Sequence, residues 1–156
     1  MKRSIFDPAV KADLLARLDK LNESTSPNWG TMKANQMLQH LQMSFKVGPG
    51  ELPIKEESTF FTRTVLRYFM LRGMVPSKER LEKSPPQTFD EINIIKSHIP
   101  VSDFYTEKEN FKKYFEKVAS HESFIPRHPR IGNMTRNDWG HQIYSHINYH
   151  FTQFGV

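Results

Sequence analysis

The 156-residue chain contains no cysteine. Disulfide bonds, thiolate nucleophiles and thiolate metal ligands are therefore excluded together, and the composition fits a reducing compartment. A long hydrophobic run is also lacking, because Arg63, Arg67 and Arg72 interrupt the most apolar stretch, residues 60–75. Such a stretch cannot span a bilayer, and no apolar segment of a signal peptide follows the basic N-terminus. We therefore expect a cytoplasmic protein with no membrane partner.

Acidic residues are fewer than basic ones: 17 Asp and Glu stand against 22 Lys and Arg, a net charge of +5 with neutral histidine. A basic surface is the electrostatic feature of nucleic-acid-binding proteins. Here the basic residues are spread along the chain without a run of five like charges, which is typical of a solvated surface. Because helix-turn-helix, zinc-finger and base-stacking motifs are also lacking, we expect no nucleic-acid partner.

The length suits a single domain over residues 1–156. Apolar residues make up only 37% of the chain, but 12 Phe and 7 Met give a core bulk. Apolar residues recur at helical spacing, and helix-capping residues precede several of these segments. The expected helices run from Asp7 or Pro8 to about Asn22, from Thr31 or Lys33 to Val47, from Ser58 to Gly73, from Ser102 or Asp103 to Ser120, and from Thr135 to about Gly155.

Two stretches do not fit the helical pattern. Residues 74–100 contain Pro76, Pro85, Pro86 and Pro100 and predict a long crossover connection, with a short strand over residues 92–95. Residues 121–132 predict a loop rich in proline and basic residues. The sequence therefore predicts an all-α bundle with one long connection.

Two of the seven histidines lie on the apolar face of the last expected helix. Trp139, Ile143, His146, His150 and Phe154 follow one another at spacings of four, three, four and four, which is the inward stripe of a packed helix. Side chains at i and i+4 lie one above the other, so both imidazoles can reach a single point off the helix surface.

His40 is placed in the same way on the second expected helix, between Met37 and Leu41. If these helices pack together, His40 converges with His146 and His150. Three imidazoles with a vacant fourth position are typical of a catalytic metal site. The alternative is that these are core histidines bonded to carbonyl groups. The residue after His146 is Ile147 and not Glu, so the H-E-x-x-H pattern and the general base that it gives the zinc proteases are absent.

The other histidines are expected to play no direct chemical role. His141 points to the opposite side of the last helix, and His98 falls in the crossover. His121 and His128 lie in the proline-rich loop, where we expect them at the surface or at a pocket mouth.

Several segments resemble the DinB-like superfamily, in its branch of unknown function. They are Trp29–Met32, Gln36–His40, His128–Pro129 with Gly132–Thr135, Trp139–Gly140 and His146–Gly155. The resemblance covers both ends of the chain, whereas residues 52–120 match only in helical character. It implies a four-helix bundle with a long connection between the second and third helices. Our expected crossover follows the third helix, so either residues 58–73 belong to that connection or the first helix is misplaced.

The resemblance also implies a divalent metal, most often nickel or zinc, held by three histidines that map onto His40, His146 and His150. Better understood members of the superfamily are thiol-dependent transferases, isomerases or hydrolases. We therefore expect a metal-dependent S-transferase or hydrolase acting on a small molecule, with a low-molecular-weight thiol as co-substrate. Three imidazoles also suit copper or ferrous iron. The alternative is a non-catalytic binding or stress-response protein that forms a homodimer through exposed helix faces.

Candidates for supporting roles are weaker. A general base is sought among Glu51, Asp103 and Glu107, and the loop around Arg127 and Arg130 is a candidate for binding an anionic end of a substrate.

Overall fold

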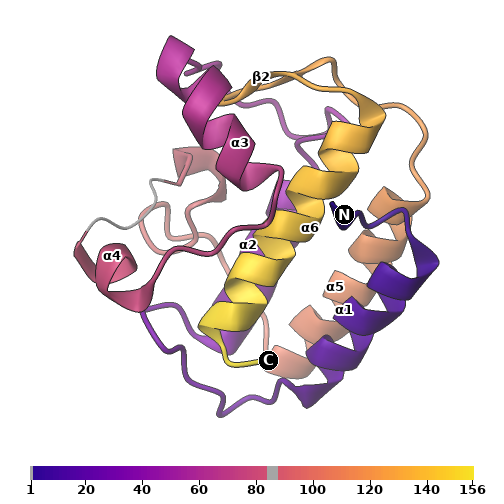
Figure 1. Cartoon of the computed structure of the whole chain (residues 1–156). Coiled ribbons are helices and arrows are strands. Elements are labelled where there is room, and N and C mark those ends of the chain that lie inside the picture. Colours follow the sequence, from indigo (N-terminus) through magenta and orange to yellow (C-terminus); the bar gives the residue numbers. More distant parts are fainter. Residues whose placement is uncertain (1, 84–87) are drawn as a thin grey trace.

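The computed structural model describes residues 2–83 and 88–156 and is mostly helical (Figure 1). Its elements are α1 (Pro8–Lys20), α2 (Ala34–Phe45), the π-helical turn η1 (Thr62–Leu66), α3 (Arg67–Met70), α4 (Lys78–Lys83), the 3-10 turn η2 (Asp90–Ile92), α5 (Phe104–Ala119), β1 (Arg127–His128), β2 (Gly132–Asn133) and α6 (Arg136–Gln153). The four longest helices are α1, α2, α5 and α6, and the described residues between α2 and α5 form only short helical pieces. The long connection therefore lies between the second and third long helices, and residues 58–73 belong to it.

The long helices begin where the capping residues predict. The Asp7 carboxylate accepts a hydrogen bond from the Ala9 amide, and Pro8 occupies the first turn of α1. Asp103 caps α5 by accepting from two backbone amides at 3.0 Å. Thr135 and Asp138 form a capping box at the start of α6.

Helices α2 and α5 form the most extensive packing contact of the fold, and α6 packs on α2 in turn (Figure 1). Ion pairs between Lys11 and Glu116 and between Lys108 and Asp19 join α1 to α5. The core between these helices is aliphatic and aromatic, and its fully buried members include Leu14, Leu18, Met37, Leu38, Leu41, Phe111, Phe115, Ile147 and Phe151. This core fixes the facing surfaces of α2 and α6, which carry the histidines.

A second, smaller core lies at the start of α6. Leu71, Ile131 and Trp139 are buried there together with Val47 and Met134. It joins η1 and α3 to the β1–β2 hairpin, whose strands pair antiparallel with His128 opposite Gly132.

Three details of the connections differ from the sequence prediction. The strand expected over residues 92–95 is wrong, because η2 occupies Asp90–Ile92 and turns follow it. The side chain of Asn93 accepts from the Lys96 amide and stabilises this turn in place of a strand. Helix α4 and the β1–β2 hairpin were not expected. Of the crossover prolines, Pro85 and Pro86 lie outside the described residues.

In the described parts of the chain, no helix has the length and apolar character needed to cross a membrane.

Candidate metal centre

Helices α2 and α6 bring His40, His146 and His150 together. The Nε2 atom of His146 lies 3.0 Å from Nε2 of His40 and 3.2 Å from Nε2 of His150. His40 and His150 are 3% and 5% exposed, and His146 is partly exposed. Within residues 2–83 and 88–156, this is the one group of three histidine or acidic side chains whose ligand atoms converge, all lying within 4.8 Å of one another.

The far side of the His40 ring is held by the long connection. Its Nδ1 atom lies 2.8 Å from the backbone carbonyl oxygen of Ile92. A carbonyl oxygen only accepts hydrogen bonds, so Nδ1 of His40 carries the proton. In the neutral ring Nε2 is then unprotonated, and its lone pair points towards the other two histidines.

The ring of His150 is oriented in the same way by a side chain of its own helix. Its Nδ1 atom lies 2.8 Å from Oε1 of Gln153, and Nε2 of Gln153 donates to the carbonyl oxygen of Trp29 at 2.7 Å. The bond to Trp29 fixes which end of the amide is nitrogen, so Oε1 must accept from Nδ1 of His150. Nε2 of His150 therefore also presents a lone pair to the centre.

Three nitrogens thus face one another with at most one proton among them while the rings are neutral. That proton, on Nε2 of His146, can point fully at only one of its two neighbours. A divalent cation between the rings would accept all three lone pairs. Zinc–nitrogen bonds of about 2.0–2.1 Å at tetrahedral angles place ligating nitrogens about 3.3 Å apart. Nε2 of His146 lies 3.0 and 3.2 Å from the other two nitrogens, and all three ligand atoms lie within 4.8 Å of one another. The donor set therefore fits a metal ion.

The electrostatics of the group favour neutral rings, which are the form that binds a metal. Burial lowers the pKa of His40 and lowers the pKa of His150 to about 3. Burial also holds the pKa of His146 well below its ordinary value, and the charges that His150 and His40 would carry lower it further. Protonation of a second Nε2 atom, which would give a charged imidazolium, is therefore unfavourable in this group.

The alternative of ordinary core histidines accounts for only half of these contacts. It explains the outer Nδ1 atoms of His40 and His150, which are bonded to carbonyl oxygens. It gives no reason for three Nε2 atoms to face one another in a buried place, because burying polar atoms without good partners is unfavourable.

The family comparison covers nearly the whole chain. A family model described as "Protein of unknown function (DUF1569)" matches residues 10–155. The chain belongs to this family. The match runs from α1 to beyond the end of α6, so it includes His40, His146 and His150. No match is found among curated proteins or among solved structures.

The remaining histidines lie outside the group. His141 bonds through Nδ1 to the carbonyl oxygen of Arg3, so it faces the N-terminal segment. His121 packs edge-on against Phe124, and His98 is exposed.

The expectation that His128 lies at the surface or at a pocket mouth is wrong: it is 5% exposed. Its ring packs against Phe89 and Trp139, and Nδ1 accepts from the backbone amides of Arg130 and Ile131. Burial and the charge of Arg130 lower the pKa of His128 to about 4. The hairpin turn folds this residue inward, which its proline-rich neighbourhood in sequence did not indicate.

The three candidate general bases are engaged elsewhere. Glu51 pairs with Lys117 at 2.7 Å, and Asp103 caps α5. Glu107 is buried, where its carboxylate accepts from Gln42 and from the amide of Ser102. All three therefore have structural roles, and none belongs to the converging group.

The two arginines proposed to bind an anionic substrate end are paired with carboxylates. Arg127 pairs with Glu56, and Arg130 lies 3.5 Å from Glu57 while its guanidinium stacks 4.1 Å from the Phe89 ring. These contacts tie the hairpin to the segment after α2.

Sequence reasoning missed the residues that orient the imidazoles. Gln153 follows His150 by three positions on α6, a spacing that places both on one face of the helix, so this partner could have been found. The carbonyl groups of Ile92 and Trp29 carry no sequence signal, because any residue supplies a carbonyl.

Gly30 completes this support. Its φ of +83° is in the left-handed region that favours glycine, and a Cβ there would lie 2.8 Å from Nε2 of Gln153. The close approach of this loop to Gln153 therefore requires glycine.

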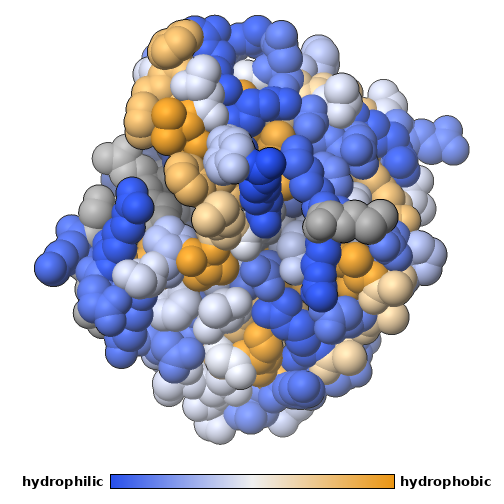
Figure 2. Space-filling model, viewed as in Figure 1, coloured by the Kyte–Doolittle hydropathy of each residue, from blue (hydrophilic) through white to orange (hydrophobic). Residues whose placement is uncertain are grey.

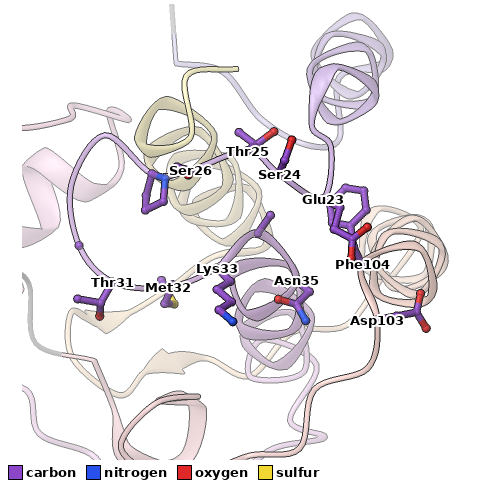
Figure 3. A pocket seen from close by; sticks show the side chains of 13 residues that line it. Glu23, Ser24, Thr25, Ser26, Thr31, Met32, Lys33, Asn35, Asp103 and Phe104 are labelled. Carbon is purple, nitrogen blue, oxygen red and sulfur yellow. The ribbon is translucent and has the colours of Figure 1, made fainter.

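A separate cavity of about 620 Å³ lies beyond this loop (Figure 3). The loop between α1 and α2, the first turn of α2 and the start of α5 surround it, with Ser24, Thr31, Lys33 and Phe104 among the lining residues. Gly30 also lines the cavity, whereas the three histidines do not. The loop from Trp29 to Gly30 therefore contacts both the cavity and Gln153, which orients His150.

Proposed function

We propose that His40, His146 and His150 hold a divalent metal, zinc or nickel, and that the protein is a metal-dependent enzyme acting on a small molecule. The observation that carries this proposal is the convergence of three Nε2 atoms whose rings are held from behind by Ile92 and Gln153. Partners on the far nitrogen fix the ring orientation of metal-binding histidines and increase their basicity.

The number of ligands supports a catalytic rather than a structural metal site. Structural zinc sites in proteins are filled by four protein ligands, whereas catalytic sites have three and an open position. A divalent metal in such a site lowers the pKa of a water or thiol that occupies the open position.

Within this class, we propose a thiol-dependent S-transferase or a hydrolase. The resemblance to the DinB-like superfamily supports the transferase, and with it a four-helix bundle built from α1, α2, α5 and α6. A low-molecular-weight thiol as co-substrate needs a reducing compartment, which the cysteine-free chain fits.

The alternative is a non-catalytic protein that uses the same metal for binding, alone or as a homodimer. It is favoured by the acidic residues: the candidate bases Glu51, Asp103 and Glu107 all have structural roles. The chain's own contribution would then be limited to holding the metal and orienting its ligands.

The first test is elemental analysis of untagged protein purified without a nickel column. We expect about one equivalent of metal in the wild type, as a three-ligand site predicts, and its loss in His146→Ala. His141→Gln is the matched control, because His141 is a buried histidine of the same helix outside the group. Failure of the wild type to take up zinc or nickel near neutral pH would overturn the metal site.

A second test separates the enzyme from the binding protein. Metal-loaded wild type and His146→Ala are assayed for transfer of a small thiol to an electrophile and for ester and amide hydrolysis. Turnover that requires both metal and His146 supports the enzyme. Stoichiometric metal without turnover in either assay favours the non-catalytic alternative.

A further inference from the structure

The helical segment formed by residues 60–70, which we call the outer helix, lies at the upper left edge of the molecule (Figure 1). It contains η1 and α3, and its contacts with the other described residues fix it along one side. Leu66 and Met70 pack against the small core around Trp139. Arg67 pairs with Asp138 at 2.9 Å and also bonds to the backbone of the β1–β2 hairpin. These contacts therefore anchor the outer helix to the rest of the protein.

The opposite side of the outer helix is apolar and faces solvent. Phe60 and Phe61 are 79% and 62% exposed, and Val65, Tyr68 and Phe69 are also exposed. Helical spacing places Phe61, Val65 and Tyr68 on one face. Figure 2 shows apolar surface gathered over this segment at the upper left. A surface helix normally turns polar residues outward, so a contiguous outward apolar face indicates an interaction site.

The charged side chains of this segment are basic. Residues 58–78 contain Arg63, Arg67, Arg72 and Lys78 and no acidic residue, whereas Glu56, Glu57 and Glu79 lie just outside this range and Arg67 is paired with Asp138. Arg63 and Arg72 are exposed, and the guanidinium of Arg72 lies 3.8 Å from the ring centroid of Tyr68, beside the apolar residues. The complementary surface is therefore apolar and anionic. A second copy related by a two-fold axis would instead place the arginines of both copies together, which is unfavourable.

We propose that the outer helix adsorbs to the surface of a bilayer that contains anionic phospholipid. Amphipathic helices with aromatic residues on one face and arginine at its edges lie in the interface between headgroups and acyl chains. Phe and Tyr supply the apolar contact, and Arg63 and Arg72 contact the lipid phosphates and carboxylates. Helix-in-groove recognition needs a groove that receives a partner helix. The outer helix instead projects from the protein, so it fits a flat surface.

Adsorption of this kind requires no spanning helix. It therefore departs from the expectation, drawn from the lack of a long apolar run, that the protein has no membrane partner. It is also independent of the proposed metal, because the residues that carry it lie on the connection and not in the histidine group.

The test is co-sedimentation of the full chain with vesicles of phosphatidylcholine alone and with about 30% phosphatidylserine, a content that gives a strongly anionic surface. We expect binding to the phosphatidylserine vesicles, and weaker binding at high salt because the attraction is screened. The double variant Arg63→Gln, Arg72→Gln should bind about 25-fold more weakly, at about fivefold for each arginine near the surface. Phe60→Ser with Phe61→Ser should reduce binding at least about tenfold by removing the apolar contact.

The matched control is Tyr105→Ser, which removes an aromatic side chain that is 68% exposed on α5. It should bind like the wild type, and thermal unfolding checks that every variant is folded. Absence of binding to phosphatidylserine vesicles, or equal effects of Tyr105→Ser and the Phe60 and Phe61 variant, would overturn the proposal. Self-association that is lost in the Phe60 and Phe61 variant, without vesicle binding, would overturn it in favour of a second copy.

Discussion

Replacement of Gln153 tests whether the contacts behind the histidines control the proposed metal site. Its amide accepts from Nδ1 of His150 at 2.8 Å and donates to the carbonyl oxygen of Trp29 at 2.7 Å, and the side chain is buried. Gln153→Leu removes both bonds at nearly constant volume. Gln153→Glu keeps an acceptor for His150 but has no proton for Trp29 when ionised.

The two variants should therefore separate metal affinity from stability. Leaving a buried partner unsatisfied costs about 1–3 kcal/mol, so Gln153→Leu, which orphans two partners, should lose about 2–6 kcal/mol of unfolding free energy. Loss of the partner that orients a ligating histidine typically weakens metal binding about 10–100-fold. Gln153→Glu should be destabilised by its unsatisfied Trp29 carbonyl, yet bind metal as tightly as the wild type or more tightly, because a carboxylate raises the basicity of His150.

The assay is zinc competition against a chromophoric chelator, paired with urea unfolding of the metal-free protein. Two results would refute the reasoning. One is wild-type zinc affinity in Gln153→Leu, which would mean that His150 needs no orienting partner. The other is an equal loss of affinity in both variants, which would mean that the acceptor on Nδ1 is not what matters.

Three other substitutions test the fold around the site. Gly30→Ala places a Cβ 2.8 Å from Nε2 of Gln153 at a φ of +83°, so it should lower stability by about 1–2 kcal/mol and weaken zinc binding in the same competition assay. The pKa of His128 falls from its ordinary value to about 4 in the folded state, so the unfolded state binds more protons between pH 6.5 and 4, and stability is lost as the pH falls through this range. His128→Asn keeps an acceptor for the hairpin amides, and between pH 7 and 4.5 its unfolding free energy should fall by about 2–3 kcal/mol less than that of the wild type. Urea titrations measure this, and identical pH profiles of the two proteins would refute it. Gly140→Ala puts a Cβ 2.5 Å from the ring of Phe6, so we expect it to displace the N-terminal segment and to cost about 1–3 kcal/mol despite the better helix propensity of alanine, as measured by thermal unfolding.

Local chemistry made the long helices predictable. Asp7 with Pro8, Asp103, and Thr135 with Asp138 cap their helices through contacts within a few residues, so the signal is complete in the sequence. The same holds for the approach of His146 and His150, because helical spacing alone places them on one face. The approach of His40 required a guess that its helix packs on the last one, which the structure shows.

The connections were less predictable because their partners are distant in sequence. His128 is buried by Phe89 and Trp139, which lie 39 and 11 positions away along the chain. The residues around Ile92 have strand-like side chains, but the hydrogen bond from the Lys96 amide to Asn93 closes a turn instead. Neither contact could be predicted from the spacing of apolar residues, because that spacing indicates only helices and strands.

The bond from His40 to the carbonyl oxygen of Ile92 has a consequence for the order of assembly. Helices α2 and α6 can bring three imidazoles near one another, but they cannot fix the tautomer of His40 until η2 has docked, and Trp29 must likewise be in place before Gln153 is fixed behind His150. We therefore expect such a centre to be complete only after both of these contacts have formed. Metal affinity then depends on the docking of the connection as well as on the three histidines. A chain with an incompletely docked connection would keep its helices but bind metal weakly. Partly unfolded states would therefore show reduced zinc affinity while their helix content is still native.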